Sequence, residues 1–364
     1  MFQTYVPGVE SSTLRDLIGS NRYTPTSDFK RLKDSEIIIL AVPTPLDSFR
    51  EPDLSLLIKA SKLIAANSES GALIINESTS YPGTLRNVIK PIFDEISSIK
   101  FEFAAAPERV DPGNSTWKIK NTPRVIAGLD INSTNKAVEF YSTFCTEIFT
   151  ASSAEVAEAS KIFENTFRQI NIALVNEFAQ IANAIGFSAH ESILAASTKP
   201  FGFMPFYPSI GVGGHCIPID PSYLSFIAKQ KGSQAKFIDL ANQVNLSMHN
   251  YVAKKIEENL GGSLKEKSIQ IAGIAYKAGV QDLRESPAIN FMSELRKLGA
   301  RVSWHDPLVK EYSEETSIEL DPEVDLGVII TPHPQIDFSI WLNKGTKVID
   351  LSASKQNYGW PKFL

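Results

Sequence analysis

The segment that decides how this chain is interpreted is Gly211-Val212-Gly213-Gly214-His215-Cys216-Ile217-Pro218-Ile219-Asp220-Pro221. Its three glycines allow the backbone to approach a ligand closely or to adopt a positive φ, where a Cβ would clash. Asp220-Pro221 predicts a helix start, with Asp220 at the N-cap and Pro221 at the first helical position. Cys216 is therefore expected just before a helix N-terminus, where the dipole favours a nucleophilic thiolate. The alternative is an inert, buried cysteine, but glycines, cysteine and aspartate together favour a catalytic one.

Composition narrows the class of protein. The 364 residues are enough for two or three domains, and 43% hydrophobic with 21% charged residues is typical of a globular protein. The net charge of −5 provides no basic field for nucleic acid or an anionic membrane, so neither is expected as a partner. Two cysteines fit a reducing compartment, and Cys145 lies in an apolar helical stretch that indicates core. We expect a cytoplasmic protein without a membrane span.

Residues 1–150 alternate between strand and helix patterns. Strands are predicted at 36–42, 72–76, 101–106 and 125–128, and crossover helices at 54–66 and 85–96. This order is typical of one half of a doubly wound, Rossmann-like sheet, which binds ligands past the carboxyl ends of its strands.

One expected feature is missing from this part of the sequence. A dinucleotide-binding sheet normally opens with a strand, a G-x-G-x-x-G turn and a helix, and the sequence contains no such turn. We therefore expect a partial, truncated Rossmann-like domain without its opening unit of roughly 30 residues. Dinucleotide binding is expected to be impaired.

Residues 151–186 predict one long helix. Ser152-Ser153-Ala154-Glu155 resembles a capping box, and Gly186 marks the end of the helix. Apolar residues cover most sides, as in a helix buried in a large protein or in a subunit interface, so a homodimer or higher homo-oligomer is expected. Lys161 and Asn165 stand four residues apart and share one face; the alternative is an ordinary surface lysine.

The remaining chain completes a three-domain prediction. Residues 187–255 continue mostly helical, and Gly261-Gly262-Ser263 marks a linker. A second Rossmann-like pattern follows, with strands at 269–276, 301–305, 326–331 and 347–351 and a helix from Ser286 to Leu298. The predicted domains are 1–150, a partial Rossmann-like domain; 151–260, an all-α dimerisation and active-site domain; and 261–364, a C-terminal α/β domain.

Several stretches resemble one enzyme family. GVGGHCIPIDPSYL resembles the active-site cysteine segment of the UDP-glucose/GDP-mannose dehydrogenase family, whose members oxidise a nucleotide-sugar alcohol to a carboxylate with two NAD. AVPTPLD, ESTSYPGT, PERVDPGN, EASKIFENTFRQINIALVNE and AYKAGVQDLRESPA follow the family's order, from about Tyr5 to the C-terminus. Within the family, PERVDPGN, FENTFRQINIALVNE and MPFYPSIGVGGHCIPIDP look most like UDP-N-acetylglucosamine 6-dehydrogenases of surface polysaccharide synthesis. The alternatives are a UDP-N-acetylmannosamine or UDP-glucose dehydrogenase, or a non-catalytic UDP-sugar-binding remnant.

The resemblance implies catalytic roles for particular residues. Cys216 corresponds to the nucleophile that holds the aldehyde, first as a thiohemiacetal and then as a thioester. Lys161 and Asn165 correspond to donors for the oxyanion at C6. Asp220 corresponds to a proton relay and Glu108 to the base for the hydrolytic water, although Asp220 is also a plausible N-cap and Glu108 a plausible partner of Arg109 or Arg124.

The resemblance also implies that domain 1–150 binds NAD, with the impairment expected above, and that domain 261–364 binds the UDP-sugar. It implies particular binding contacts as well. Those to NAD are Pro43, Thr44, Thr79 and Arg284, and Thr79 also lies near the nicotinamide and a catalytic water. Those to the UDP-sugar are Glu108, Lys161, Asn165, Gly213 and Lys277. No metal ion is implied.

Overall fold

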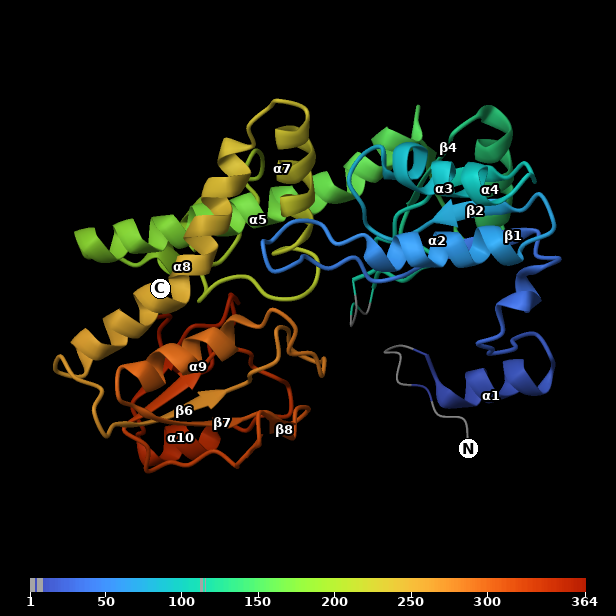
Figure 1. Ribbon diagram of the computed structural model, residues 1–364. Coiled ribbons are helices and arrows are strands. Elements are labelled where there is room, and N and C mark those ends of the chain that lie inside the picture. Colours follow the sequence, from blue (N-terminus) through green and yellow to red (C-terminus); the bar gives the residue numbers. More distant parts are fainter. Residues whose placement is uncertain (1–3, 5–8, 112–113, 115) are drawn as a thin grey trace. The chain divides into compact units, whose positions relative to one another are not determined.

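The computed structural model describes residues 4, 9–111, 114 and 116–364 (Figure 1). The chain divides into two compact units. Unit 1 comprises Met1–Asn165 and Ile219–Gln234, and unit 2 comprises Thr166–Pro218 and Ala235–Leu364. The three domain boundaries predicted from the sequence stay a prediction.

Unit 1 is built on a five-stranded sheet in the order β1-β2-β3-β4-β5. The strands are β1 (Ile37–Leu40), β2 (Leu73–Asn76), β3 (Glu102–Ala105), β4 (Arg124–Gly128) and β5 (Ile148–Thr150). Neighbouring strands are parallel except β3 and β4, which are antiparallel. The strands predicted between residues 36 and 128 are thus present, and only β5 was not predicted.

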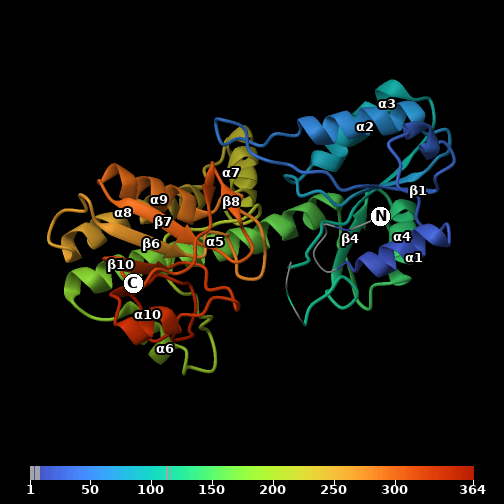
Figure 2. The same cartoon turned by 90° about the horizontal axis from the view of Figure 1, so that it is seen from below.

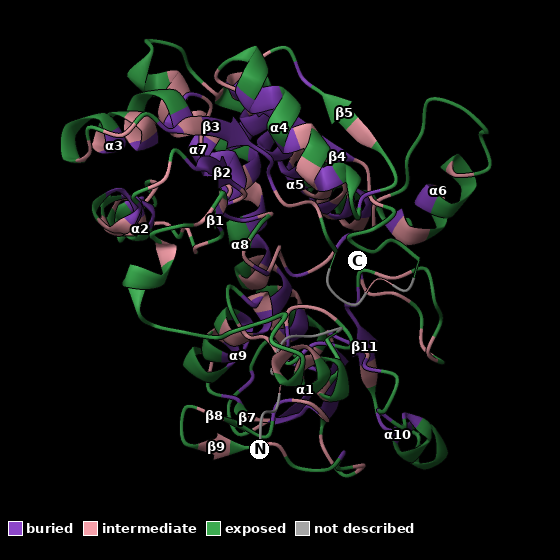
Figure 3. Ribbon diagram, turned by 90° about the vertical axis from the view of Figure 1, so that its right-hand side faces the viewer, coloured by how far each residue is buried: buried purple, intermediate pink, exposed green. Residues whose placement is uncertain are grey.

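Helices cover both faces of this sheet, and alternate strand residues face them. Ile38, Ile74 and Phe103 belong to the apolar core shared with α2 and α3, whereas Ile75 and Ala104 belong to the core shared with α4. Figure 3 shows these strands as mostly buried. The helical elements of unit 1 before α5 are α1 (Ser11–Gly19), η1 (Phe29–Leu32), α2 (Ser55–Asn67), η2 (Leu85–Ile89), α3 (Lys90–Ile96) and α4 (Ile131–Ser142). Burial on both faces explains why the central strands have continuous apolar sequences.

Four helices follow β5 and precede the next strand in the described chain. They are α5 (Ala154–Ile185), α6 (Ala189–Ala196), α7 (Asp220–Gln230) and α8 (Lys236–Asn259). The long helix predicted at residues 151–186 is present as α5. Ser153 precedes it and accepts a hydrogen bond from the Val156 N–H at 3.3 Å, so the cap lies one residue later than the predicted capping box of Ser152 and Glu155 places it. None of the helices in residues 9–111 and 116–364 is both long and apolar enough to cross a membrane.

Unit 2 contains a second parallel sheet, in the order β11-β10-β6-β7. Its elements are β6 (Ser268–Ala272), α9 (Pro287–Lys297), β7 (Arg301–His305), β10 (Leu326–Ile329), α10 (Ser339–Lys344) and β11 (Val348–Asp350), with a short hairpin of β8 (Glu311–Tyr312) and β9 (Glu315–Thr316). Ile269, Ile271 and Val328 share a core with α9, whereas Ala272 and Ile329 pack with Trp341 of α10. Figures 1 and 2 show α9 and α10 with this sheet between them. The predicted fold class, mixed α/β with two Rossmann-like sheets and a helical middle segment, is confirmed.

Candidate functional site

Helices α5 and α7 bring three predicted catalytic residues together inside unit 1. Lys161, Asn165 and Asp220 are all buried, with at most 9% of each residue exposed. The Asn165 amide Nδ2 donates a hydrogen bond of 2.6 Å to the Asp220 carboxylate, across 55 residues of sequence. Lys161 and Asn165 lie one turn apart on α5, so the predicted shared face is present, and Lys161 is not the surface lysine of the alternative interpretation.

The predicted N-cap role of Asp220 is wrong. Helix α7 begins at Asp220 itself, and the residue in the N-cap position is Ile219. The Asp220 carboxylate accepts a hydrogen bond from Asn165. Its side chain is therefore held by another helix, and the Asp-Pro pattern predicted the helix start to within one residue but assigned the carboxylate the wrong partner.

The Asp220 carboxyl has a strongly perturbed acidity. Burial raises its pKa to about 7, while the Asn165 hydrogen bond and the positive charge of Lys161 act in the opposite direction. A carboxyl with a pKa near neutrality can both take up and release a proton at physiological pH. This is the property that a proton relay requires.

The predicted cofactor residues of unit 1 lie past the carboxyl ends of β1 and β2. The Thr44 hydroxyl donates to the Thr79 carbonyl at 2.8 Å, and the Ser78 hydroxyl accepts from the Val42 N–H at 2.8 Å. These bonds hold the two loops together at the edge where parallel sheets bind ligands. The buried Tyr223 of α7 donates to the Thr44 carbonyl at 2.7 Å, which ties this edge to the helix that carries Asp220. Sequence reasoning did not single out Tyr223.

Glu108 lies beside a buried arginine. Its carboxylate receives hydrogen bonds from the Arg124 guanidinium at 2.5 Å and from the backbone N–H groups of Arg109 and Val110. Burial raises the pKa of Glu108, but the Arg124 charge and these hydrogen bonds outweigh burial, and the net pKa is lowered. Arg124 also pairs with Glu77, so it bridges two carboxylates. The Arg124 partnership considered from the sequence is present, and the role of Glu108 as a base stays a prediction.

A second buried carboxylate on α5 was not predicted. Glu158, one turn before Lys161, accepts hydrogen bonds from the backbone N–H groups of Gly83 at 2.6 Å and Leu85 at 2.8 Å. Burial raises its pKa to about 8, against the lowering effect of those two bonds. Glu158 therefore connects α5 to the turn that follows the Thr79 loop.

In unit 2 the glycine-rich segment packs against Tyr276. A Cβ at Gly213 would lie 2.9 Å from the Tyr276 Cβ, and one at Gly214 would lie 2.8 Å from the Tyr276 ring. Gly214 also has a φ of 87°, which side chains rarely adopt. Only glycine fits these two positions, so the segment is shaped for close packing. Cys216 is exposed, whereas Cys145 is buried in the core as predicted, although it follows α4 and does not lie in a helix.

Cys216 and its predicted helix neighbour belong to different units. Cys216 lies in unit 2, and α7 begins four residues later in unit 1. The predicted effect of the α7 dipole on the Cys216 thiolate therefore stays a prediction.

A cavity of about 520 Å³ in unit 2 contains two of the predicted substrate residues, Gly213 and Lys277. Its cations are Lys277 and Arg168, and its rings come from Phe206, Tyr207, Tyr276 and Tyr358. This volume lies within the usual range of small-molecule sites, and cations beside aromatic rings suit a ligand with an anionic part and a flat ring. Sequence reasoning missed Arg168 and the aromatic residues, although Tyr276 stands directly before Lys277.

Asp306 and His333 hold the backbone of the loop that carries Lys277. The Asp306 carboxylate accepts from the backbone N–H groups of Ile274 and Ala275, and lies 3.1 Å from the His333 ring. The Gly279 N–H donates to the other ring nitrogen of His333 at 3.1 Å, so Nε2 carries the proton that faces Asp306 when the ring is neutral. Arg284, the predicted NAD contact in unit 2, is exposed and pairs with Asp282 at 2.6 Å.

Comparison with known proteins adds three family matches. All belong to the UDP-glucose/GDP-mannose dehydrogenase family: its NAD binding domain matches residues 2–145, its central domain 155–247 and its UDP binding domain 270–353.

Two relatives and one solved structure illustrate the similarity. A UDP-N-acetyl-D-glucosamine 6-dehydrogenase of Salmonella typhi is 32% identical over 310 residues, 83% of this chain and 72% of that protein. A UDP-N-acetyl-D-mannosamine dehydrogenase of Pyrococcus horikoshii is 35% identical over 340 residues, 91% of this chain and 79% of that protein. The solved structure of a UDP-D-ManNAc dehydrogenase from P. horikoshii has a TM-score of 0.86 and 31% identity, and covers 100% of this chain and 87% of its own.

Proposed function

Because the chain belongs to the UDP-glucose/GDP-mannose dehydrogenase family, as its motifs predicted, we propose that it is an NAD-dependent UDP-sugar 6-dehydrogenase. The substrate that we propose is UDP-N-acetylglucosamine, oxidised at C6 to the uronic acid for surface polysaccharide synthesis. The observation that carries the proposal is the buried set of Lys161, Asn165 and Asp220, with an Asp220 pKa of about 7. A buried cation, amide and titrating carboxyl are the groups that alcohol oxidation and thioester hydrolysis require.

The residues of unit 1 suit one half of NAD. Pro43, Thr44 and Thr79 lie at the carboxyl edge of β1 and β2, and we propose them as the residues that would hold the nicotinamide. Arg284 is a further NAD contact that we propose. When bound, NAD accepts one hydride from C6 in each of the two oxidation steps.

The chain's own residues supply the remaining chemistry. The first oxidation turns the C6 alcohol into an aldehyde, and the Cys216 sulfur bonds to the aldehyde carbon to give a thiohemiacetal. Loss of a second hydride leaves a thioester, and water cleaves the C–S bond to release the acid and the Cys216 thiol. Lys161 and Asn165 stabilise the negative charge that develops on the C6 oxygen in these steps.

Protons move through the carboxylates. Asp220 takes the proton of the C6 alcohol in the first oxidation, returns it to the C6 oxygen when the Cys216 thiolate adds to the aldehyde, and takes it again in the second oxidation. Its pKa of about 7 makes both directions accessible. Glu108 takes a proton from the hydrolytic water, and Thr79 holds that water beside the nicotinamide. The positive charge of Arg124 lowers the pKa of Glu108, which makes Glu108 a weak base. We therefore assign Glu108 to the hydrolysis of the thioester, which is already activated.

The cavity of unit 2 is proposed as the UDP site. Lys277 and Arg168 provide positive charge for the diphosphate, and Gly213 lines the same cavity. The names of the relatives support an N-acetylhexosamine, and UDP-N-acetylmannosamine and UDP-glucose remain the alternative substrates.

A specific observation supports a second proposal about the cofactor. In the described part of unit 1, no glycine-rich turn joins a strand to a helix, and the Gly83 N–H is already bonded to Glu158. Binding of the NAD diphosphate normally relies on such a turn. We infer that UDP-sugar binds to the described units more tightly than NAD.

We also propose a homodimer formed through α5. Phe163, Leu174 and Ile185 are each more than 60% exposed on this helix, and Phe167 and Ile181 are exposed as well. Several large exposed apolar side chains on one helix are typical of a surface that is covered in an assembly.

The test of the activity is acid formation. Purified chain is incubated with UDP-N-acetylglucosamine and saturating NAD, and the product is identified by mass spectrometry. Release of the uronic acid with two NADH per sugar supports the proposal. UDP-N-acetylmannosamine and UDP-glucose are run in parallel, and faster oxidation of either would replace the proposed substrate.

A further inference from the structure

The C-terminal segment 352–364 forms part of the unit 2 cavity. Four of its residues line that cavity, namely Ser352, Ala353, Ser354 and Tyr358. The UDP binding domain match ends at residue 353, so Tyr358 lies outside the residues that the family match covers. Family membership therefore assigns no role to this part of the wall.

A buried ion pair fixes this segment against β11. The Lys362 ammonium lies 2.7 Å from the Asp350 carboxylate, and their side chains are 8% and 0% exposed. Lys362 also donates to the Ser352 hydroxyl at 2.7 Å, and the Phe363 N–H donates to the Asp350 carbonyl at 3.0 Å. Removing one member of such a pair leaves a buried, uncompensated charge, so the pair sets where the segment lies.

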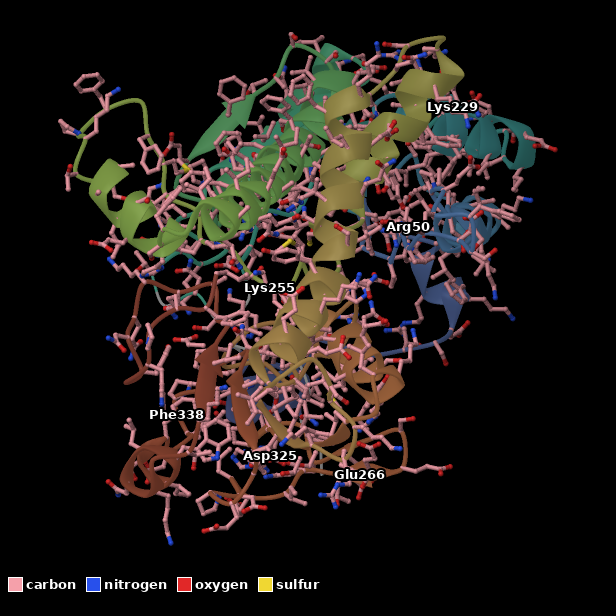
Figure 4. All side chains as sticks on the ribbon, turned by 90° about the vertical axis from the view of Figure 1, so that its left-hand side faces the viewer. Arg50, Lys229, Lys255, Glu266, Asp325 and Phe338 are labelled. Atoms are coloured by element: carbon pink, nitrogen blue, oxygen red, sulfur yellow. The ribbon has the colours of Figure 1, made fainter. Side chains whose placement is uncertain are left out.

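Tyr358 is held in a defined place within this segment. Its ring centroid lies 5.6 Å from that of Phe338, which Figure 4 labels in unit 2. The Lys362 ammonium lies 5.4 Å from the Tyr358 ring, and the Tyr358 hydroxyl donates to the Gln356 side chain at 3.2 Å. The anchoring lysine thus contacts both β11 and the aromatic residue of the wall.

We propose that segment 352–364 forms the wall of the cavity that binds the nucleoside half of a nucleoside diphosphate, with Tyr358 as a specificity-determining contact and Lys362 as a positioning residue. This rests on the proposed UDP site. Besides Ala353, the lining residues of the segment are the hydroxyl-bearing Ser352 and Ser354 and the aromatic Tyr358, which suit a base and ribose. The cations of the cavity, Arg168 and Lys277, come from other segments and suit the diphosphate.

The test is calorimetric titration of the full chain with UDP, with inorganic pyrophosphate as the comparison. Tyr358→Ala should raise the Kd for UDP about three- to tenfold, the range for loss of one aromatic contact. Tyr358→Phe should stay within about twofold of wild type because it keeps the ring. Lys362→Met should weaken UDP binding at least as much as Tyr358→Ala. Pyrophosphate affinity should be unchanged in all three variants, since they leave Arg168 and Lys277 in place.

Several outcomes distinguish this inference from the function on which it rests. Lys344→Met is the matched control, because Lys344 forms an exposed pair with Glu323 outside the cavity lining. Wild-type UDP affinity in both Tyr358→Ala and Lys362→Met would overturn the inference while leaving the UDP site intact. Equal weakening of UDP and pyrophosphate would also overturn it, since it would indicate general damage to unit 2. If the wild-type chain binds no UDP, the proposed site fails and this inference fails with it. If Lys362→Met does not fold, Tyr358→Ala alone decides.

Discussion

Replacing Asp220 by asparagine should make the folded protein less sensitive to rising pH. Asp220 is buried, and burial raises its pKa from the ordinary 3.8 to about 7. An asparagine has nearly the same shape, and its side-chain oxygen can still accept the hydrogen bond that Asn165 donates at 2.6 Å. The substitution therefore removes the titration of Asp220 and little else.

The sign and size of the effect follow from linkage. A carboxyl whose pKa is higher in the folded than in the unfolded chain binds its proton more tightly when folded. Between pH 3.8 and about 7 the wild-type free energy of unfolding therefore falls as pH rises. The slope approaches about 1.4 kcal/mol per pH unit. From pH 5 to pH 7 the stability of Asp220→Asn relative to wild type should rise by about 2–3 kcal/mol.

The assay is urea unfolding followed by far-ultraviolet circular dichroism at pH 5, 6, 7 and 8. Asp130→Asn is the matched control. Asp130 caps α4, and the backbone hydrogen bond from Ser133 lowers its pKa, so both its folded and unfolded values lie below the tested range. Its stability difference from wild type should stay constant from pH 5 to 8. The same constancy for Asp220→Asn would refute the reasoning and indicate that Asp220 is charged throughout.

Three further predictions concern catalysis, assembly and the cofactor. Cys216→Ser should abolish acid formation in the enzyme assay, and undiminished turnover would exclude Cys216 as the nucleophile. Light scattering at micromolar concentration should give the mass of a dimer, and Leu174→Glu should shift it to the monomer; a monomeric wild-type chain would contradict the α5 interface. Titration should detect binding of UDP-N-acetylglucosamine. NAD should bind a few orders of magnitude more weakly than it binds to a domain with a glycine-rich turn, because each missing hydrogen bond to a charged group costs roughly 1.5–3 kcal/mol of binding free energy. Micromolar NAD affinity would show that the remaining contacts suffice.

Most strands of the two main sheets could be predicted because their burial follows from apolar residues along the strand. Strands β2 and β10 are buried throughout, since neighbours cover both faces of a central parallel strand. The apolar run Ile37–Leu40 was also predicted as a buried strand, but β1 lies at the edge of the described sheet and Ile39 is exposed. Helix α4 was missed because its sequence INSTNKAVEFYS is largely polar, although Asp130 before it is an N-cap signal that could have revealed it. The antiparallel direction of β4 could not be predicted, because strand direction depends on the connection and not on the strand's own residues.

In the candidate site, too, features set by neighbouring residues could be predicted, whereas contacts between residues far apart in the sequence could not. Spacing placed Lys161 and Asn165 on one face of a helix, because four residues are about one helical turn. Pairing of Asn165 with Asp220 and of Glu158 with Gly83 joins residues 55 and 75 apart, and no local pattern encodes either. The cavity residue Tyr358 lies in a tail without recognisable periodicity, so only the fold brings it beside Lys277.

Asp220 shows how a correct local rule can assign a wrong role. An aspartate before a proline at a helix start is normally stabilising, because its carboxylate accepts the free N–H groups of the first turn. Here α7 begins at Asp220 itself, its carboxylate is bonded to Asn165, and burial raises its pKa to about 7. A carboxylate held in this way destabilises the folded state at neutral pH, although placing it at the N-cap would have been stabilising. A buried carboxyl that lowers the stability of the folded state at neutral pH is expected at a functional site, where its perturbed pKa serves the reaction. The departure from the capping rule is therefore itself an argument that Asp220 acts in proton transfer.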